Sequence, residues 1–167
     1  SDGHEFIVSD FSAIEARVIA WLAGETWVLD TFREGHDIYK ATANQMFHLG
    51  GVDKVDKAMR QRGKVATLAL GYQGGTGALQ AMGALKMGIK EDELQGLVNA
   101  WRTANPNIVK FWRRVEAAAK RALEFGTKVS LRGTGISFYV RDTFFMIGLP
   151  NGRSIAYANA TLEDGRI

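Results

Sequence analysis

The sequence predicts an α+β fold in which a mainly helical body precedes a small antiparallel sheet. Apolar side chains recur at helical spacing between residues 12 and 125, and after Gly126 the pattern changes to short β-rich runs. Asn151-Gly152, between the last two runs, is typical of a two-residue hairpin. Strands are expected at about residues 5–10, 127–131, 136–140, 144–149 and 153–158, and helices at about 12–24, 27–33, 38–49, 53–70, 76–87, 91–104 and 107–125.

Local signals indicate where several of these elements begin and end. The first strand is a short apolar run that ends in the carboxylate of Asp10. Ser12-x-x-Glu15 matches the capping box that opens a helix. Asp37 is expected to cap the third helix, and Gly50-Gly51 to end it.

The composition is that of a folded globular protein, with 46% hydrophobic and 23% charged residues. No apolar run approaches the ~20 residues of a membrane span, so no membrane partner is expected. The absence of Cys excludes disulfides and thiolate metal sites. A net charge of +3 is compatible with nucleic acid as a partner.

Positive charge concentrates in two segments, residues 54–64 and 110–121. On a helix over residues 107–125, Lys110, Arg114 and Arg121 fall within ~40° of one another, opposite an apolar face. This basic stripe is either a solvated helix face or a track along a phosphate backbone.

The expected helix over residues 53–70 begins a ladder of side chains four residues apart. Arg60 and Lys64 come first, and Leu68 and Tyr72 follow. Because each four-residue step turns a helix by about 400°, the ladder winds through only ~120°. A ligand beside it would meet positive charge at one end and stacking surface at the other, the polarity of a nucleoside triphosphate. This segment does not match a P-loop, because Gly63-Lys64 is followed by Val65 and not by Ser or Thr.

Other polar residues have two interpretations when each is taken alone. Asp10 is placed to bind Mg²⁺, or to bond a nearby backbone amide in a turn. Glu15 has an ordinary role in the capping box, and Arg17 on a solvated helix face. Metal-ligand spacing is absent among the histidines, which are His4, His36 and His48.

Taken in order, three segments resemble motifs of the family A DNA polymerases. Residues 10–17, Asp-Phe-Ser-Ala-Ile-Glu-Ala-Arg, resemble motif A, Asp-Tyr/Phe-Ser-x-Ile-Glu-x-Arg. Residues 35–43 are similar to the family's Asp-Ile-His-x-x-Thr-Ala segment, and Arg60-x3-Lys64-x7-Tyr72 to motif B. Residues 63–75 and 149–153 are most similar to the phage- or prophage-encoded branch of this bacterial DNA polymerase I-like family. The resemblance is specific over residues 6–77 and looser over 78–165.

The resemblance implies a role for each motif residue. It implies two Mg²⁺ ions, one of them bound by the Asp10 carboxylate and the Phe11 carbonyl, with the second carboxylate in a motif C that this chain does not reach. Asp10 and Lys64 are the implied catalytic residues, Lys64 supplying charge or a proton to the leaving pyrophosphate. The expected dNTP-binding residues are Phe11, Ser12, Glu15, Tyr39, Arg60, Lys64, Leu68 and Tyr72, and the expected DNA-binding residues are Arg17, Tyr72, Lys110, Arg114 and Arg121.

The sequence departs from the family pattern at three of these positions. Leu68 stands where the family usually has Phe or Tyr, and Tyr39 stands in place of a His that touches the triphosphate. Ala13 stands where bacterial members often have Gln. Sugar discrimination and stacking at Leu68, and the role of Tyr39, are the properties that these departures affect.

The implied domains are a palm strand and helix with motif A (1–24), helical fingers with the motif B helix at about 53–70 (25–126), and a β-rich return to the palm (127–167). The implied function is template-directed DNA synthesis, by nucleotidyl transfer from dNTPs to a primer 3′-hydroxyl. Primer–template DNA, dNTPs and the remainder of the polymerase are the expected partners, in a monomer in the cytoplasm of a bacterial cell or phage-infected host. Without motif C, these residues alone are not expected to polymerise. The alternatives are a non-catalytic helical nucleic-acid-binding module that retains the fold and a nucleotide-binding regulatory domain.

Overall fold

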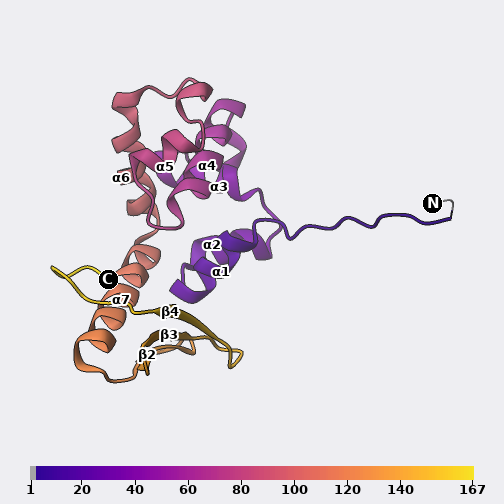
Figure 1. The fold of residues 1–167 in the computed structure, drawn as a ribbon. Coiled ribbons are helices and arrows are strands. Elements are labelled where there is room, and N and C mark those ends of the chain that lie inside the picture. Colours follow the sequence, from indigo (N-terminus) through magenta and orange to yellow (C-terminus); the bar gives the residue numbers. More distant parts are fainter. Residues whose placement is uncertain (1–2) are drawn as a thin grey trace. The chain divides into compact units, whose positions relative to one another are not determined.

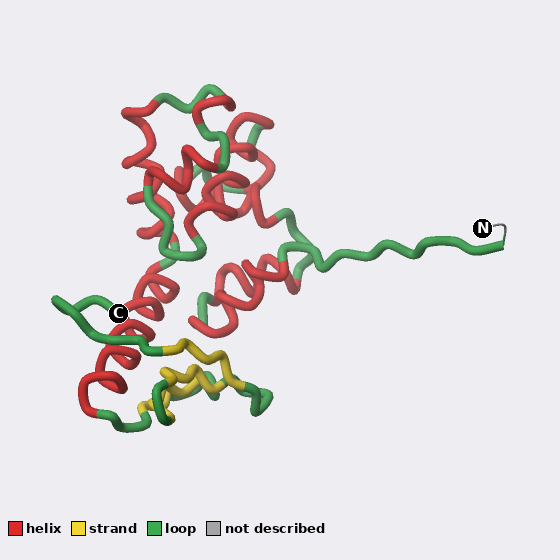
Figure 2. Tube along the Cα trace, in the orientation of Figure 1, coloured by secondary structure: helices red, strands yellow, loops and turns green. Residues whose placement is uncertain are grey.

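The computed structural model describes residues 3–167 and confirms the α+β fold, with helices first and an antiparallel sheet after them (Figure 1, Figure 2). The helices are α1 (Ile14–Ala23), α2 (Thr26–Arg33), α3 (Ile38–Phe47), α4 (Lys57–Leu70), α5 (Thr76–Ala81), α6 (Leu94–Ala104) and α7 (Pro106–Phe125). Short 3-10 turns are η1 (Val52–Lys54), η2 (Leu85–Met87) and η3 (Glu91–Glu93), and the strands are β1 (Val129–Leu131), β2 (Ile136–Arg141), β3 (Phe144–Gly148) and β4 (Ser154–Ala158).

The chain folds into two compact units. The N-terminal unit contains the chain up to Trp21 together with Thr26–Trp101, and the C-terminal unit contains Leu22–Glu25 and Arg102–Ile167. No helix within residues 3–167 has the length and apolar character needed to cross a membrane.

The N-terminal unit is organised around the packing of α4 on α3. Gly63 lies at the closest approach, because a Cβ atom there would be 2.1 Å from the Tyr39 carbonyl oxygen and 3.0 Å from the Ala43 nitrogen. One turn further along, the hydroxyls of Thr67 and Thr42 are 3.1 Å apart. The two helices therefore touch through backbone and small side chains, which sets the height of α4 over the start of α3.

Two predictions at the N-terminus are wrong. Residues 4–10 form no strand, and Phe6, Ile7 and Val8 are more than 90% exposed. A strand is stable only when a neighbouring strand satisfies its backbone groups, and no described segment pairs with this one. The capping box does not form either: Ala13 is left-handed (φ 50°) and α1 begins at Ile14, so Ser12 is one residue too early to cap it.

The predicted boundaries of α3 and α4 needed smaller corrections. Asp37 does cap α3, with its Oδ1 atom accepting from the amides of Tyr39 (2.9 Å) and Lys40 (3.2 Å). The helix ends at left-handed His48, two residues before the expected glycines. The predicted helix over residues 53–70 is divided into η1 and α4, because Asp56 is extended and caps α4 by accepting from the Met59 amide at 2.7 Å.

In the C-terminal unit the long helix α7 is capped from a distant part of the sequence. Asn105 precedes the helix without a side-chain cap, and the buried carboxylate of Glu25 accepts from the amides of Asn107 (2.9 Å) and Ile108 (3.3 Å). A carboxylate at a helix N-terminus satisfies unpaired amides and interacts favourably with the helix dipole. Glu25 thus provides the N-terminal cap of α7 that the residues next to the helix do not provide.

The sheet is a four-stranded antiparallel meander in the order β1-β2-β3-β4, and α7 packs against β1 and β2 (Figure 2). Phe138 and Phe145 are buried with stacked rings whose centroids are 6.1 Å apart. The β3–β4 connection is a three-residue loop rather than the predicted two-residue turn. The Leu149 amide donates to the Arg153 carbonyl at 2.8 Å, and Gly152 takes a left-handed φ of 83°.

Candidate functional site

A pocket of about 390 Å³ in the N-terminal unit brings the three motif segments together. Four of the predicted site residues line it: Ser12 and Arg17 from motif A, Tyr39 from the first turn of α3, and Arg60 from the first turns of α4. Its remaining lining residues are Ala13, Phe32, Gly35, His36, Asp37 and Ile38.

Arg17 is one of the two arginines that line this pocket. Its guanidinium lies over the Phe32 ring, 3.9 Å from the centroid, and its Nε atom donates to the Ser12 carbonyl at 2.9 Å. Its backbone amide also donates to the carbonyl of left-handed Ala13. Arg17 therefore braces the turn before α1 against α2, and its guanidinium is already engaged on one face.

Arg60 and Asp37 line the same pocket as an ion pair. Arg60 Nε donates to Asp37 Oδ2 at 2.7 Å, and the Arg60 guanidinium carbon lies 5.3 Å from the Tyr39 ring centroid. Burial on its own would raise the pKa of Asp37, but the hydrogen bonds from Arg60 and from the amides of Lys40 and Tyr39 outweigh it and hold that pKa below its usual value. Asp37 is thus an ionised partner of Arg60 at neutral pH.

The rest of the predicted ladder continues along α4. Lys64 Nζ is 6.0 Å from the Tyr39 ring centroid, so one aromatic ring serves both cations. Leu68 is half-buried one turn on. Tyr72 lies past the helix end at Leu70 and is 72% exposed, so a turn rather than the helix sets its position.

Glu15 lies beside Tyr72, although the two residues are far apart in the sequence. Burial first, and then the charge and hydrogen bond of the Glu15 carboxylate, raise the pKa of the Tyr72 phenol. The end of the ladder and motif A are therefore in contact through these two side chains. The capping-box interpretation of Glu15 is thus replaced by a long-range contact, and the dNTP-binding role that the resemblance implies for it stays a prediction.

Asp10 and Phe11, the predicted metal ligands, lie in the exposed segment before α1. A carboxylate and a carbonyl are hard oxygen donors, and Mg²⁺ is commonly held by one or two carboxylates together with substrate phosphates. The donor set therefore has the right chemistry for Mg²⁺. Across residues 3–167, however, no group of three or more His, Asp or Glu side chains is arranged to hold a metal ion.

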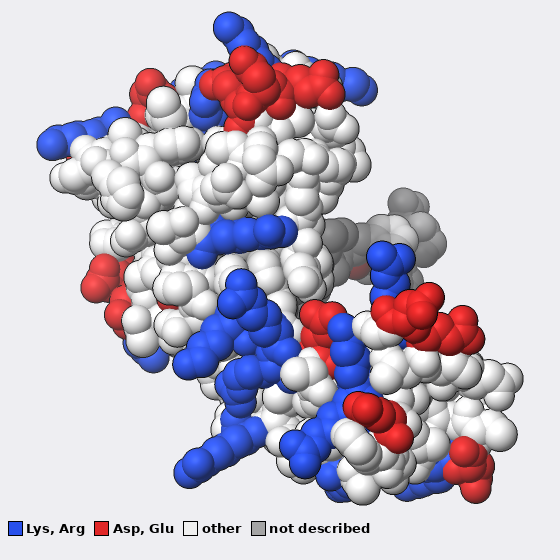
Figure 3. All heavy atoms as spheres, turned by 90° about the vertical axis from the view of Figure 1, so that its left-hand side faces the viewer, with Lys and Arg blue, Asp and Glu red and all other residues white. Residues whose placement is uncertain are grey.

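The net positive charge of the chain comes from the C-terminal unit. It has 11 Lys and Arg against 6 Asp and Glu, a net of +5, whereas the N-terminal unit has 10 against 12, a net of −2. Figure 3 shows Lys and Arg side chains gathered on the face that carries α7. Lys110 and Arg121 are exposed there, and Arg114 donates to the Arg132 carbonyl at 2.9 Å.

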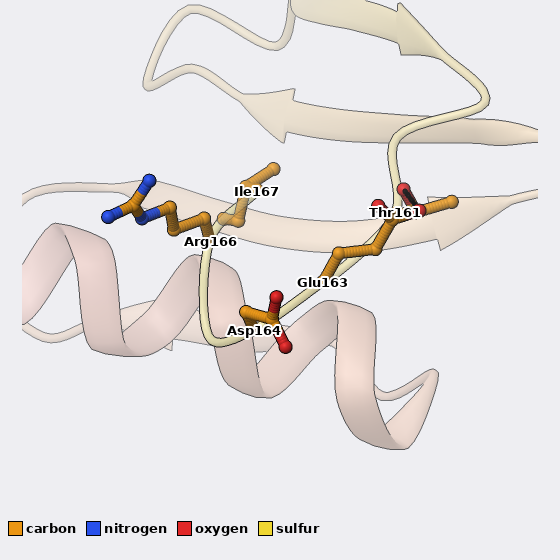
Figure 4. Close-up of a pocket in the computed structure, with 5 residues that line it drawn as sticks. All are labelled: Thr161, Glu163, Asp164, Arg166 and Ile167. Carbon is orange, nitrogen blue, oxygen red and sulfur yellow. Dashed lines mark hydrogen bonds between the residues drawn. The ribbon is translucent and has the colours of Figure 1, made fainter.

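A second hollow, of about 490 Å³, lies in the segment after β4 (Figure 4). The Glu163 and Arg166 backbones exchange two hydrogen bonds around Asp164-Gly165, whose φ angles are both positive (48° and 72°). Asp-Gly is a strong signal for this tight turn, and our sequence interpretation overlooked it. The hollow is the larger of the two, but it is bounded by one exposed loop and contains no predicted site residue.

Sequence reasoning missed two residues that shape the pocket. Asp37 was expected only as a helix cap, and its second oxygen binds Arg60, 23 residues away. Phe32 had no predicted role, and its ring holds Arg17. The resemblance of residues 35–43 to a polymerase segment was the one signal that pointed to this region.

Comparison with known proteins connects this geometry to one family. The family model for "DNA polymerase family A" matches residues 1–135. A DNA polymerase of Bacillus phage SP02 is 56% identical over 165 residues, which cover 98% of this chain and 25% of the phage protein. DNA polymerase I of Pseudomonas aeruginosa is 29% identical over 70% of the chain and 12% of its own length, and the thermostable DNA polymerase I of Thermus thermophilus is 36% identical over 54% and 10%.

The family-model match spans the pocket-forming segments and the whole of α7. The chain spans only a quarter or less of the length of these relatives. The predicted family is confirmed, as is the expected likeness to phage-encoded members. The chain belongs to DNA polymerase family A.

Proposed function

We propose that the full-length protein carries out template-directed DNA synthesis, transferring a nucleotidyl group from a dNTP to a primer 3′-hydroxyl. In this proposal residues 25–126 are the dNTP-binding fingers, and residues 1–24 and 127–167 are parts of the palm. The observation that carries it is the pocket that gathers Ser12, Arg17, Tyr39 and Arg60 from three separate motif segments. Family membership supports the same activity.

The chain's own residues provide the triphosphate end of the site. Arg60 and Lys64 lie one helical turn apart above the Tyr39 ring and bind the phosphates. Tyr39, which replaces the family's His, keeps both cations close together and offers its hydroxyl as a donor. Lys64 balances the charge of the departing pyrophosphate, or supplies its proton, because phosphoryl transfer depends mainly on such electrostatic stabilisation.

Further residues are assigned to the nucleoside. Phe11 and Ser12 border the sugar, and Glu15 lies where a ribose 2′-hydroxyl would be excluded. Tyr72, held by Glu15, faces the templating base. Leu68 is half-buried and smaller than the aromatic residue usual in the family, so it offers little stacking surface.

Asp10 and the Phe11 carbonyl would hold one of two Mg²⁺ ions, with the second carboxylate supplied elsewhere in the full-length protein. Bound Mg²⁺ would lower the cost of deprotonating the primer hydroxyl and neutralise charge on the phosphates. We propose on the same grounds that these 167 residues do not polymerise on their own.

DNA contacts are proposed for the basic face of α7, through Lys110, Arg114 and Arg121, and for Tyr72. Arg17 is a weaker candidate than the sequence indicated, because it is engaged with Phe32 and Ser12. In this proposal the role of Arg17 is to hold the motif A turn in place. A monomer in the cytoplasm of a bacterial cell or phage-infected host completes the proposal.

Primer extension by the full-length protein tests this function. Asp10→Ala should abolish incorporation while duplex binding persists, and Lys64→Ala should lower kcat by ~10²-fold, the usual cost of losing one electrostatic stabiliser. Asp53→Ala, an exposed carboxylate outside the pocket, is the matched control. Undiminished activity in Asp10→Ala would favour the alternative, a non-catalytic nucleic-acid-binding module. Metal-dependent extension by residues 1–167 alone would contradict the proposal that they are inactive in isolation.

A further inference from the structure

Asp37 uses both of its carboxylate oxygens, and each has a different task. Oδ1 caps α3 by accepting from the amides of Tyr39 and Lys40, and Oδ2 accepts from Arg60 Nε at 2.7 Å. The cap orients the carboxylate, because a side chain that bonds two amides of the first turn has little rotational freedom left. Oδ2 is thereby aimed at α4.

The distance between the two helices is equally constrained. Gly63 places the α4 backbone against the Tyr39 carbonyl, so α4 cannot shift toward or away from α3 without breaking this contact. Arg60 lies about one turn before Gly63 and contacts Asp37, the N-cap of α3. The Asp37–Arg60 contact therefore follows from the positions of α3 and α4, and is not a chance contact between two flexible surface side chains.

The contact determines which edge of the guanidinium remains for a ligand. Asp37 binds Nε, and the Tyr39 ring lies beside the guanidinium at 5.3 Å. A contact through Nε leaves the two terminal nitrogens, with four N–H donors in one plane, to meet phosphate oxygens. Arg60 and Asp37 line the same pocket, so the donors that remain belong to its wall.

We propose that Asp37 is a positioning residue that holds Arg60 ready for the triphosphate of the incoming nucleotide. The inference rests on the proposed function and adds to it a residue that touches neither the reacting atoms nor the phosphates. Preorganisation of this kind increases affinity because the long arginine side chain has already lost its rotational freedom before the ligand arrives.

Asp37 could also have the opposite effect and weaken triphosphate binding. The positioning role and this competing role predict opposite changes in affinity when the Asp37 charge is removed. A carboxylate near a triphosphate repels it, and an ion pair must be broken if the phosphate needs Nε. If Asp37 competes with the nucleotide in this way, removing its charge tightens binding. If Asp37 positions Arg60, removing its charge weakens binding.

Asp37→Asn separates the cap from the ion pair. Asn is as good an N-cap as Asp, so Oδ1 can still accept from the α3 amides. The other atom becomes an N–H₂ donor that faces the Arg60 Nε donor, and the ion pair is lost. Asp56→Asn is the matched control, because Asp56 caps α4 through the Met59 amide and lies outside the pocket.

The experiment measures single-nucleotide incorporation by the full-length protein over a range of dNTP concentrations. Asp37→Asn should raise KM for dNTP by about 5- to 30-fold, a charged hydrogen bond discounted for its partial exposure, with kcat within twofold. Asp56→Asn should leave both parameters within twofold. Binding of inorganic tripolyphosphate, measured by calorimetry without turnover, should weaken in Asp37→Asn alone.

Other outcomes overturn the inference, and they separate it from the proposed function. An unchanged or lowered KM in Asp37→Asn shows that Asp37 does not position Arg60, while an active parent protein still supports the polymerase proposal. Equal losses in both Asn variants show a capping effect only. A parent protein that neither incorporates nucleotides nor binds tripolyphosphate removes the proposed function and this inference together.

Discussion

Gly63→Ala tests whether the close approach of α3 and α4 sets the geometry of the pocket. The added Cβ would lie 2.1 Å from the Tyr39 carbonyl oxygen, a backbone atom that cannot rotate aside. The helices must separate by roughly 1 Å to restore a normal distance, and overpacking of this kind costs ~1–3 kcal/mol. Arg60 and Lys64 would move with α4, so nucleotide binding should weaken as well.

Gly96→Ala is the matched control, in the same unit and also inside a helix. Nothing lies within 4 Å of a Cβ at Gly96. Both variants gain the ~1 kcal/mol by which Ala is favoured over Gly in a helix, so this gain cancels between them. The difference between the variants therefore reports the overpacking at Gly63 alone.

In the full-length protein, this difference is measured by hydrogen exchange of those α3 and α4 amides that exchange only when the whole N-terminal unit unfolds. A loss of ~1–3 kcal/mol corresponds to exchange about 5- to 150-fold faster in Gly63→Ala than in Gly96→Ala. If the two variants protect these amides equally, the packing of α4 on α3 is not as tight as the structure has it, and our explanation of how Arg60 is placed is wrong.

Two more predictions concern the C-terminal unit. Glu25→Ala should destabilise this unit by ~2–3 kcal/mol, because two amides at the start of α7 lose their buried partner. The stability of Glu25→Gln should lie between that of Glu25→Ala and that of the parent protein. Chemical denaturation, monitored by hydrogen exchange of the α7 amides, measures both effects. Replacing Lys110 and Arg121 together with Gln should make the slope of log K against log salt for duplex binding shallower by about 2, because each removed cation leaves one DNA phosphate without its protein partner.

The chain offers matched controls for both. Glu124→Ala removes an exposed carboxylate of α7 and should change stability by less than ~0.5 kcal/mol. Replacing exposed Lys54 and Lys86 of the N-terminal unit with Gln removes the same charge and should leave the salt slope unchanged. Equal effects of test and control variants would show that α7 has no special role in either property.

Much of the local structure could be predicted from the sequence because its causes are local. Apolar periodicity located α7 and its buried face, and Asp37 was correctly identified as the cap of α3. The spacing of Arg60 and Lys64 correctly indicated two cations on one side of a helix, since residues four apart are neighbours there. Family membership also followed from the residues, order and spacing of the three motifs.

The failures share a different cause. The run at residues 5–10 has the composition of a strand, but composition does not supply the neighbouring strand that pairing requires. Ser12 and Glu15 have the spacing of a capping box, but left-handed Ala13 shifts the start of α1. Glu25 resembles an ordinary acidic residue until the fold brings it to α7, 82 residues away.

By itself, the sequence determined the helical body and the sheet that follows it, the family, and most residue types of the candidate site. Only the tertiary structure decided which partner each site residue has: Asp37 for Arg60, Tyr72 for Glu15, and Phe32 for Arg17. The physical reason is range. Helix periodicity, caps and turns arise from residues within a few positions of one another, whereas these pairs depend on how whole helices pack, and at Gly63 that packing depends on the absence of a single Cβ atom.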